Sequence, residues 1–350
     1  MDSYFGLDKE TQGALLESAL NQGHGPNAAV LEKDIWLCLV LQELFSMPNA
    51  LPMVFKGGTS LSKVYTAISR FSEDVDVTLD WRKLVTPPVD LGALSNNAIR
   101  NLSEQIQAAL EKYLEDTLRP ALEEQLKRHA DVSVEFARDD EGKEIKKDAL
   151  VVHYPSAADY GNGYIRPSVL IEFGGRNDIE PEEERIIAPE VATLFPGIRF
   201  PEARVTVLSP IRTFWEKATL AHDEAHRPVQ KKRSSERQSR HWYDLFRLAD
   251  HNIGREALAS RTILEQVVAT KTRFFKYAFS RYDLCLKGEF RIIPDQSALS
   301  ELQADYVTMT NASMFYGDPV DWASVESRLR ALEKEINTAI FPSQPAIEAT

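Results

Sequence analysis

Residues suited to chemistry are concentrated in two short stretches of the chain, residues 55–61 (FKGGTSL) and residues 70–76 (RFSEDVD). The second stretch places Asp74 and Asp76 two positions apart where polar and apolar residues alternate. Alternate side chains of a strand lie on one face, so we expect both carboxylates to point the same way. Two neighbouring carboxylates withdrawn from water repel each other unless a cation lies between them. The pair therefore predicts a metal site at Asp74 and Asp76, with oxygen ligands that suit Mg²⁺ or Mn²⁺.

The first stretch is typical of a strand end, a glycine turn and a helix start. Gly57 and Gly58 allow the backbone to approach a ligand closely, and a helix N-terminus offers free N–H groups to a phosphate. Thr59 or Ser60 can cap this helix or donate a hydroxyl group to a phosphate, and Lys56 can add a positive charge. A plain turn followed by a capped helix explains the same residues, so that alternative stays open.

Charged residues farther along the chain could join this chemistry. Glu172 lies in a segment, 169–173, that otherwise reads as a buried strand, so it is a metal ligand, a general base or the partner of an arginine. Lys217, on a predicted helix, binds nucleotide phosphates as a point charge or is a solvated lysine. Asp244 lies at the edge of the site, holds Lys217 in position or pairs with Arg240 one turn earlier. The remaining candidates for nucleotide binding are Arg70, Ser72 and Arg240.

The elements that must position these residues predict an α+β fold. We expect two helices within residues 8–47, a helix over 60–69 and a long helical stretch over 91–129 with an interruption at Pro120. Pro87 and Pro88 break the chain before this stretch. The acidic run 180–184 reads as a solvated loop. Strands are predicted at 53–56, 74–80, 132–136, 149–154, 169–173 and 205–207, with a hairpin turn at 140–143. Helices are predicted at 209–224, 236–250, 255–279, 298–311 and 321–340.

This pattern predicts two domains. Residues 1–208 hold the mixed sheet with a helical N-terminal cap, and residues 209–350 form a helical domain that completes the site. The length of 350 residues suits this division.

Composition narrows the class of protein. The net charge of −12 argues against general nucleic-acid binding through bulk electrostatics, although basic residues gather between Arg227 and Arg240 and could bind a triphosphate or an RNA backbone. No apolar run is long enough to cross a membrane, and the start of the chain lacks the features of a signal peptide. Cys38 and Cys285 lie in apolar contexts, so buried thiols in a reducing cytoplasm are expected.

These stretches resemble the AbiEii/AbiGii-type nucleotidyltransferase toxins of type IV toxin–antitoxin and abortive-infection (phage-defence) systems, which are related to the MenT toxins. The matching segments are residues 31–34, 55–63, 70–76, 216–218, 240–245, 305–309 and 314–315, so the resemblance spans about residues 30–340. The glycine block, 55–63, and the aspartate block, 70–76, are together a specific signal of the family, whereas each helical block is a weak signal alone.

The resemblance implies a DNA-polymerase-β-like nucleotidyltransferase core with a divalent metal cofactor. Gly58 with Thr59 or Ser60 matches the glycine–hydroxyl motif of the family, and Asp74 and Asp76 match its metal carboxylates. Lys217 matches the nucleotide-binding lysine, Asp244 the acidic residue of the last motif, and Glu172 the third-carboxylate strand only loosely.

We therefore expect transfer of a nucleotide from an NTP to an acceptor hydroxyl with release of pyrophosphate. The resemblance favours the 3′ end of tRNA as the acceptor and a cognate antitoxin as a partner. Two alternatives stay open: the same chemistry on a protein or small-molecule hydroxyl, which the negative charge favours, and a non-catalytic regulatory protein built on this fold.

Overall fold

The chain folds into two compact units, Met1–Thr66 with Arg70–Leu208, and Ser209–Thr350 with the short segment Ala67–Ser69. This computed structural model describes residues 2–86, 91–138, 144–160, 166–228, 237–312 and 314–340. The predicted break at Pro87 and Pro88, the hairpin turn at 140–143 and most of the basic segment after Arg227 lie outside the described residues.

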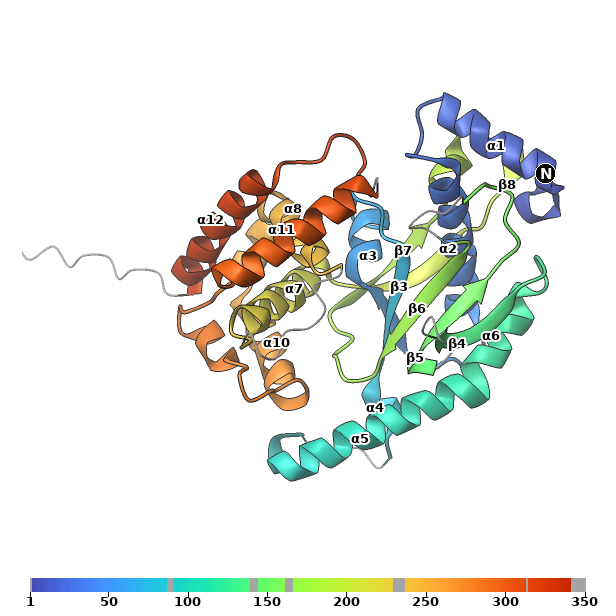
Figure 1. The fold of residues 1–350 in the computed structure, drawn as a ribbon. Helices are drawn as coiled ribbons and strands as arrows, with labels where there is room; N and C mark the ends of the chain where they lie inside the picture. Colours follow the sequence, from blue (N-terminus) through green and yellow to red (C-terminus); the bar gives the residue numbers. More distant parts are fainter. Residues whose placement is uncertain are drawn as a thin grey trace, which may run out of the picture. The chain divides into compact units, whose positions relative to one another are not determined.

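Within the described residues, the first unit is built on a mixed seven-stranded sheet in the order β4-β5-β6-β3-β2-β9-β7 (Figure 1). The central strand β3 pairs antiparallel with β2 on one side and parallel with β6 on the other. Two further short strands, β1 (Asp2–Ser3) and β8 (Ile198–Arg199), form a separate parallel pair. The strands of the main sheet are β2 (Met53–Lys56), β3 (Asp74–Leu79), β4 (Ser133–Arg138), β5 (Glu144–His153), β6 (Ser168–Gly174), β7 (Glu182–Ile187) and β9 (Ala203–Leu208). The α+β prediction is confirmed.

The prediction that the acidic run 180–184 is a loop is wrong. Strand β7 begins at Glu182 and pairs antiparallel with β9 at the edge of the sheet. Its residues are mostly exposed, and charged side chains are common on edge strands because they prevent pairing with other chains. Glu183 also accepts a hydrogen bond of 2.8 Å from the Tyr65 hydroxyl, which ties the strand to the segment after α3.

Helices of the first unit confirm the two predicted N-terminal helices and correct the next two. The Asn27 side chain caps α2 by accepting from the Val30 N–H. Helix α3 ends at Lys63 rather than at residue 69, and Thr66 adopts a positive φ of 50°. The predicted helical stretch over 91–129 is interrupted by the π-helical turn η3, which ends at Leu118, and Pro120 follows in the first turn of α6, where its ring cannot continue the preceding hydrogen-bond ladder. The helical elements are η1 (Tyr4–Gly6), α1 (Lys9–Asn21), α2 (Ala28–Ser46), α3 (Gly57–Lys63), α4 (Trp81–Leu84), η2 (Leu91–Ala93), α5 (Asn96–Tyr113), η3 (Leu114–Leu118), α6 (Arg119–Leu126) and η4 (Glu190–Thr193).

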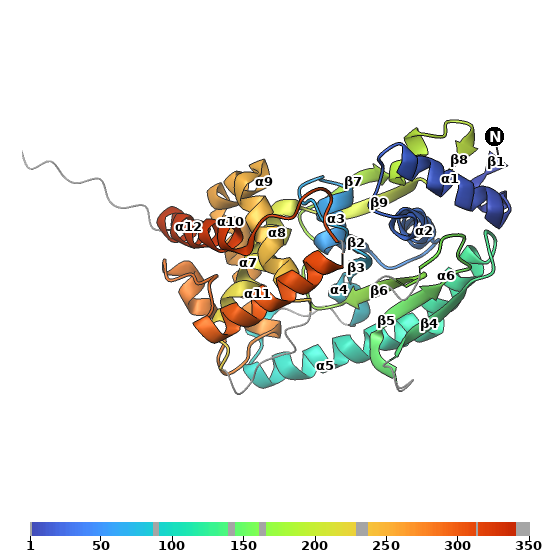
Figure 2. The same ribbon diagram turned by 45° about the horizontal axis from the view of Figure 1, so that its top comes forward.

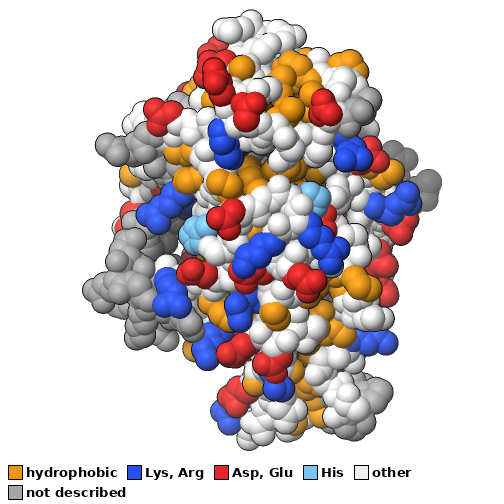
Figure 3. Space-filling view, turned by 90° about the vertical axis from the view of Figure 1, so that its right-hand side faces the viewer, with side chains coloured by type: hydrophobic (Ala, Val, Ile, Leu, Met, Phe, Trp, Pro, Cys, Tyr) orange, Lys and Arg blue, Asp and Glu red, His pale blue; other side chains and the backbone are white. Residues whose placement is uncertain are grey.

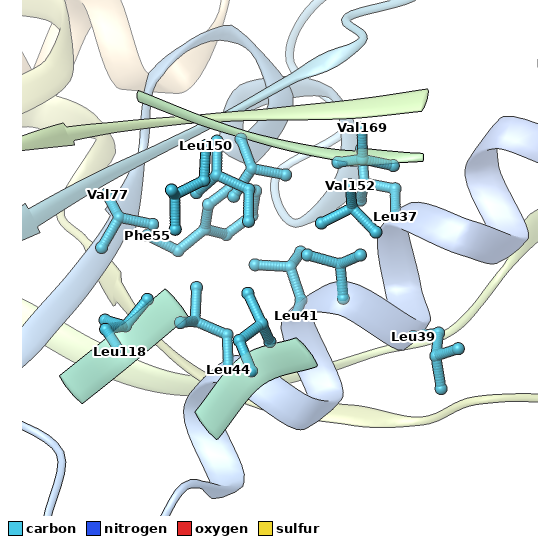
Figure 4. Close-up of a cluster of buried hydrophobic side chains, with 14 of the residues drawn as sticks. Leu37, Leu39, Leu41, Leu44, Phe55, Val77, Leu118, Leu150, Val152 and Val169 are labelled. Carbon is cyan, nitrogen blue, oxygen red and sulfur yellow. The ribbon is translucent and has the colours of Figure 1, made fainter. Parts of the chain in front are cut away.

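The core of the first unit lies between one face of the sheet and helix α2. Figure 4 shows leucines of α2, among them Leu41 and Leu44, facing side chains of the strands such as Phe55, Val77 and Leu150. Alternation along β3 sends Val75, Val77 and Leu79 into this core, so Asp74, Asp76 and Thr78 lie on the opposite face. The chemistry-bearing residues are thus kept apart from the apolar packing that fixes their strand.

The second unit is helical. Helix α7 packs against α8, α9 and α10, and α8 also packs against α11 and α12, in agreement with their adjacency in Figure 2. The segment Ala67–Ser69 belongs to this unit, where the Ser69 carbonyl accepts from the Tyr316 N–H at 3.1 Å. One predicted helix, 255–279, is instead two helices that meet at Ser260. The elements are α7 (Pro210–Ala225), α8 (Ser239–Asp250), α9 (Asn252–Ala259), α10 (Arg261–Phe274), η6 (Tyr282–Leu286), α11 (Gln296–Asn311) and α12 (Trp322–Ile340).

Basic and acidic side chains intermingle over the face of the molecule drawn in Figure 3. None of the helices in the described part of the chain has the length and apolar character required to span a bilayer.

Candidate active site

The predicted metal carboxylates lie on one face of β3 next to a third carboxylate. Asp74 is 7% exposed and Asp76 is half-buried, and both lie opposite the core face of the strand. In the parallel pairing of β3 with β6, Asp76 is directly in register with Glu172. Residues in register on neighbouring strands share a face and are close neighbours, so Glu172 adjoins Asp76.

A lysine lies on the other side of this row. The antiparallel pairing of β2 with β3 places Lys56 in register with Asp76. One position along three adjacent strands therefore carries Lys56, Asp76 and Glu172 in that order. A cation beside two carboxylates lowers the repulsion between them, so the sheet can hold this acidic pair without unfolding locally.

The glycine turn lies against these residues. Gly57 has a φ of 81°, and a Cβ atom there would lie 2.0 Å from Asp76 Oδ2. A Cβ atom on Gly58 would lie 2.5 Å from Arg70 Nη2 and 2.9 Å from Ser72 Oγ. The two glycines are thus required for close approach, and the turn brings together Asp76, Arg70 and Ser72, which the sequence placed in one site.

The hydroxyl groups of Thr59 and Ser60 are used inside the protein. Helix α3 begins at Gly57, so neither residue is its N-cap, and that prediction is wrong. The Thr59 hydroxyl donates to the Asp74 carbonyl and lies 2.9 Å from the Ser72 hydroxyl, while the Ser60 hydroxyl donates to the Gly57 carbonyl at 3.0 Å. Both side chains are buried. Thr59 fastens the turn to the start of β3 and so helps to fix the position of Asp74, whereas Ser60 closes the turn on itself.

A buried ion pair behind the site escaped the sequence reasoning. Lys33 Nζ lies 2.8 Å from Glu73 Oε2, with side-chain exposures of 4% and 8%. The pair joins α2 to the residue directly before Asp74. The sequence indicates this pair only indirectly, because each partner is a charged residue in an apolar setting. Lys33 lies within a run of apolar helix residues, and Glu73 lies directly before a buried strand.

Two neighbouring acidic residues of α2 also bind other segments of the first unit. Asp34 pairs with Lys63 of α3 at 2.6 Å. Burial alone lowers the pKa of the Lys63 ammonium, but the charge and hydrogen bond of Asp34, together with weaker effects of Cys38 and Glu190, hold the pKa above its ordinary value. The fully buried Glu32 accepts hydrogen bonds from the Ser156 hydroxyl at 2.7 Å and the Ala157 N–H at 2.6 Å.

The second unit holds the other predicted residues. Lys217 of α7 forms a salt bridge of 2.9 Å with Asp244 of α8, and the two side chains are 9% and 0% exposed. Lys217 Nζ also lies 3.4 Å from Nδ1 of His241, on the same helix as Asp244. Of the alternatives for Asp244, the structure supports the one in which it holds Lys217 in position. Arg240, on the first turn of α8, is partly buried.

The donor set on β3 suits a magnesium ion that is completed by its substrate. Among the described residues, no group of three or more His, Cys, Asp or Glu side chains converges as a ready-made metal site. Mg²⁺ is usually bound by one or two carboxylates together with waters and substrate phosphates. Asp74 and Asp76, on one face beside the glycine turn, match that arrangement.

Comparison with known proteins agrees with this architecture. The fold resembles that of MenT4, a nucleotidyltransferase toxin from Mycobacterium tuberculosis H37Rv, with a TM-score of 0.52 and 18% sequence identity over 97% of this chain and 91% of that one. No curated protein sequence matches the chain. The family model described as nucleotidyl transferase AbiEii toxin, type IV TA system, matches residues 40–330. The chain therefore belongs to the AbiEii family and is a nucleotidyltransferase toxin of a type IV toxin–antitoxin system.

Proposed function

We propose that this toxin transfers a nucleotidyl group from an NTP to the hydroxyl at the 3′ end of tRNA, with a divalent metal ion at Asp74 and Asp76. Family membership implies the NTP substrate and an antitoxin partner. The observation that carries the metal assignment is the carboxylate of Asp76 held against Gly57, beside Lys56 and on the same face as Asp74. We further propose a cytoplasmic setting, in accord with the two buried free thiols.

The residues of the first unit have separate roles in this proposal. Asp74 and Asp76 would hold Mg²⁺ or Mn²⁺, which when bound neutralises charge on the phosphates of the NTP. Lys56 and the Gly57–Gly58 backbone approach the same phosphates, and Arg70 supplies a guanidinium beside Gly58. Thr59, Ser60 and Ser72 support the turn through the hydrogen bonds described above.

The chemical step forms one bond and breaks one. The acceptor hydroxyl oxygen attacks the α-phosphorus, the bond from that phosphorus to the bridging oxygen breaks, and pyrophosphate leaves with that electron pair. Glu172, in register with Asp76, is the carboxylate proposed to take the hydroxyl proton. Positioning and charge neutralisation supply most of the rate in such reactions.

In the second unit, Lys217 is proposed as a phosphate-binding residue. Asp244, which is fully buried, would then orient the ammonium group through their salt bridge of 2.9 Å. Arg240 stays a proposed nucleotide-binding residue on the resemblance alone.

Incubation of the purified protein with Mg²⁺, each labelled NTP in turn, and total cell extract tests this proposal. Label is expected in tRNA with the wild type, and Asp76→Asn is expected to abolish it while circular dichroism is unchanged. Glu135→Gln, an exposed carboxylate of β4, is the matched control and should keep full activity. Label in protein or in small molecules, instead of tRNA, would show that the acceptor is not the 3′ end of tRNA. Full activity of Asp76→Asn would overturn the metal assignment.

A further inference from the structure

One segment of the second unit departs from the acidic character of the chain. Residues 271–281 (KTRFFKYAFSR) contain four cations and no acid, although acidic residues outnumber basic ones by 53 to 41 overall. Arg273, Lys276 and Arg281 are exposed, and Lys271 is half-buried with its Nζ 4.9 Å from the ring centre of Phe275. The segment covers the end of α10 and the loop that follows it.

Aromatic rings alternate with these cations and form a stacked surface. Tyr277 and Phe279 have ring centroids 5.5 Å apart and planes inclined by only 6°. The guanidinium of Arg227, at the end of α7, lies 4.5 Å from the Phe279 ring centre and 5.9 Å from that of Tyr277. Tyr277 is 46% exposed, one of the few large apolar side chains of the described residues that face solvent.

The stacked rings and the guanidinium beside them are held in place by hydrogen bonds within the protein. Ser280 closes the turn by accepting from the Tyr277 N–H at 3.0 Å, and its own hydroxyl donates to the carboxylate of Asp223 on α7. Two hydrogen bonds from Arg227 to Glu224, of 2.6 and 2.7 Å, hold the guanidinium over the rings. A surface ordered in advance loses less conformational entropy on binding.

We infer that this basic–aromatic patch, formed by residues 271–281 with Arg227, binds single-stranded RNA. Successive bases stack on aromatic rings while cations along the same path contact the phosphates, which is the usual way in which proteins bind single strands without reading sequence. An exposed stacked pair is better suited to unpaired bases than to a duplex, whose bases are already stacked. The inference deepens the proposed function and rests on it, because it makes an RNA with unpaired nucleotides the acceptor.

Fluorescence anisotropy of the full-length protein with a labelled 12-nucleotide single-stranded RNA tests the patch. The assay contains EDTA and no NTP, so it does not depend on the transfer reaction. Tyr277→Ala is expected to weaken binding by about 5- to 150-fold, which is the effect of losing one stacked base. The plot of log K against log salt concentration has a negative slope, and each phosphate contact to a single strand contributes about 0.7 to its magnitude. Arg273→Glu with Lys276→Glu should therefore make the slope shallower by about 1.4 or more.

The control reverses two exposed charges of the same unit away from the patch, Arg255→Glu with Lys334→Glu, and should bind RNA within about twofold of the wild type. Equal affinity of the patch variants and this control would overturn the inference, as would patch variants that lose binding to anionic lipid vesicles but keep binding to RNA. Loss of RNA binding by the patch variants, together with label transfer to a protein acceptor by the wild type, would support the patch and refute the proposed acceptor.

Discussion

Replacing Glu73 by leucine is expected to destabilise the first unit by about 3–5 kcal/mol, because it leaves the ammonium of Lys33 buried without a counter-charge. Lys33 is only 4% exposed on its side chain, and its remaining hydrogen-bond partner among the described residues is the Arg166 carbonyl at 3.4 Å. A neutral carbonyl does not offset the loss of hydration of a buried charge.

The companion variant removes both charges. Lys33→Met with Glu73→Leu replaces the pair by apolar side chains of similar length, which is often neutral or stabilising by about 1–4 kcal/mol. The double variant should therefore be close to the wild type or more stable, and the double-mutant cycle should give a coupling of at least about 3 kcal/mol. Glu123→Leu, which breaks the exposed Lys127–Glu123 pair of 2.6 Å, is the control and should change stability by about 0.5 kcal/mol or less.

Hydrogen exchange of β3 measures this effect within the first unit alone, which matters because a protein of two units need not unfold in one step. Amides of β3 in Glu73→Leu should exchange about a hundredfold to several thousandfold faster than in the wild type, since each 1.4 kcal/mol is about tenfold. Nucleotidyl transfer should fall in the single variant, because an unpaired buried charge next to β3 loosens the strand that carries Asp74, and it should return in the double variant, which leaves no buried charge unpaired. A change below about 1 kcal/mol, or a double variant as unstable as the single one, would refute the reasoning.

Three further perturbations follow from the same geometry. Gly57→Ala should cost about 1–2 kcal/mol of stability, because the backbone at this position has a φ of 81°. It should also reduce nucleotidyl transfer, because the new Cβ atom displaces the Asp76 carboxylate. Wild-type transfer by this variant in the label assay would contradict the close packing of the turn against the carboxylate. Asp244→Leu should destabilise the second unit by about 3–5 kcal/mol in a denaturant titration, because it leaves Lys217 buried without its partner. Adding Lys217→Met should restore stability but not nucleotidyl transfer. If transfer also returned, Lys217 would not be a phosphate-binding residue. Burial lowers the pKa of His222 from 6.5 to about 4, so the unfolded chain binds this proton at a higher pH than the folded chain does. The free energy of unfolding of the second unit should therefore fall by about 3 kcal/mol as the pH falls from 6.5 to 4. This loss should be absent when the unfolding of His222→Gln is measured over the same pH range.

The site could be predicted from the sequence where local spacing determines geometry. The i, i+2 spacing of Asp74 and Asp76 fixes a common face of a strand whatever the rest of the chain does. Glu172, which is half-buried, could be named as a carboxylate within a strand, but its place in register with Asp76 depends on a pairing between strands almost a hundred residues apart. No local pattern contains that register.

The errors have the same physical origin. The acidic run that begins β7 has low strand propensity, and its pairing with β9 outweighs that propensity. No role is predicted from the sequence for two charged residues of α2, Lys33 and Asp34, which pair with Glu73 and Lys63 from other elements. Interactions between distant segments, rather than local preference, decide both cases.

In the proposed reaction, Asp74 and Asp76 hold a divalent ion against the phosphates of the nucleotide. Electron paramagnetic resonance of Mn²⁺, titrated into the protein with an NTP analogue that cannot be cleaved between its α- and β-phosphates, measures that binding directly. The wild type and Glu135→Gln should bind Mn²⁺ equally, and Asp74→Asn with Asp76→Asn should lose at least about 100-fold in affinity, since even changes behind the ligands cost about 10- to 100-fold. Unchanged Mn²⁺ affinity in the double aspartate variant would contradict the account.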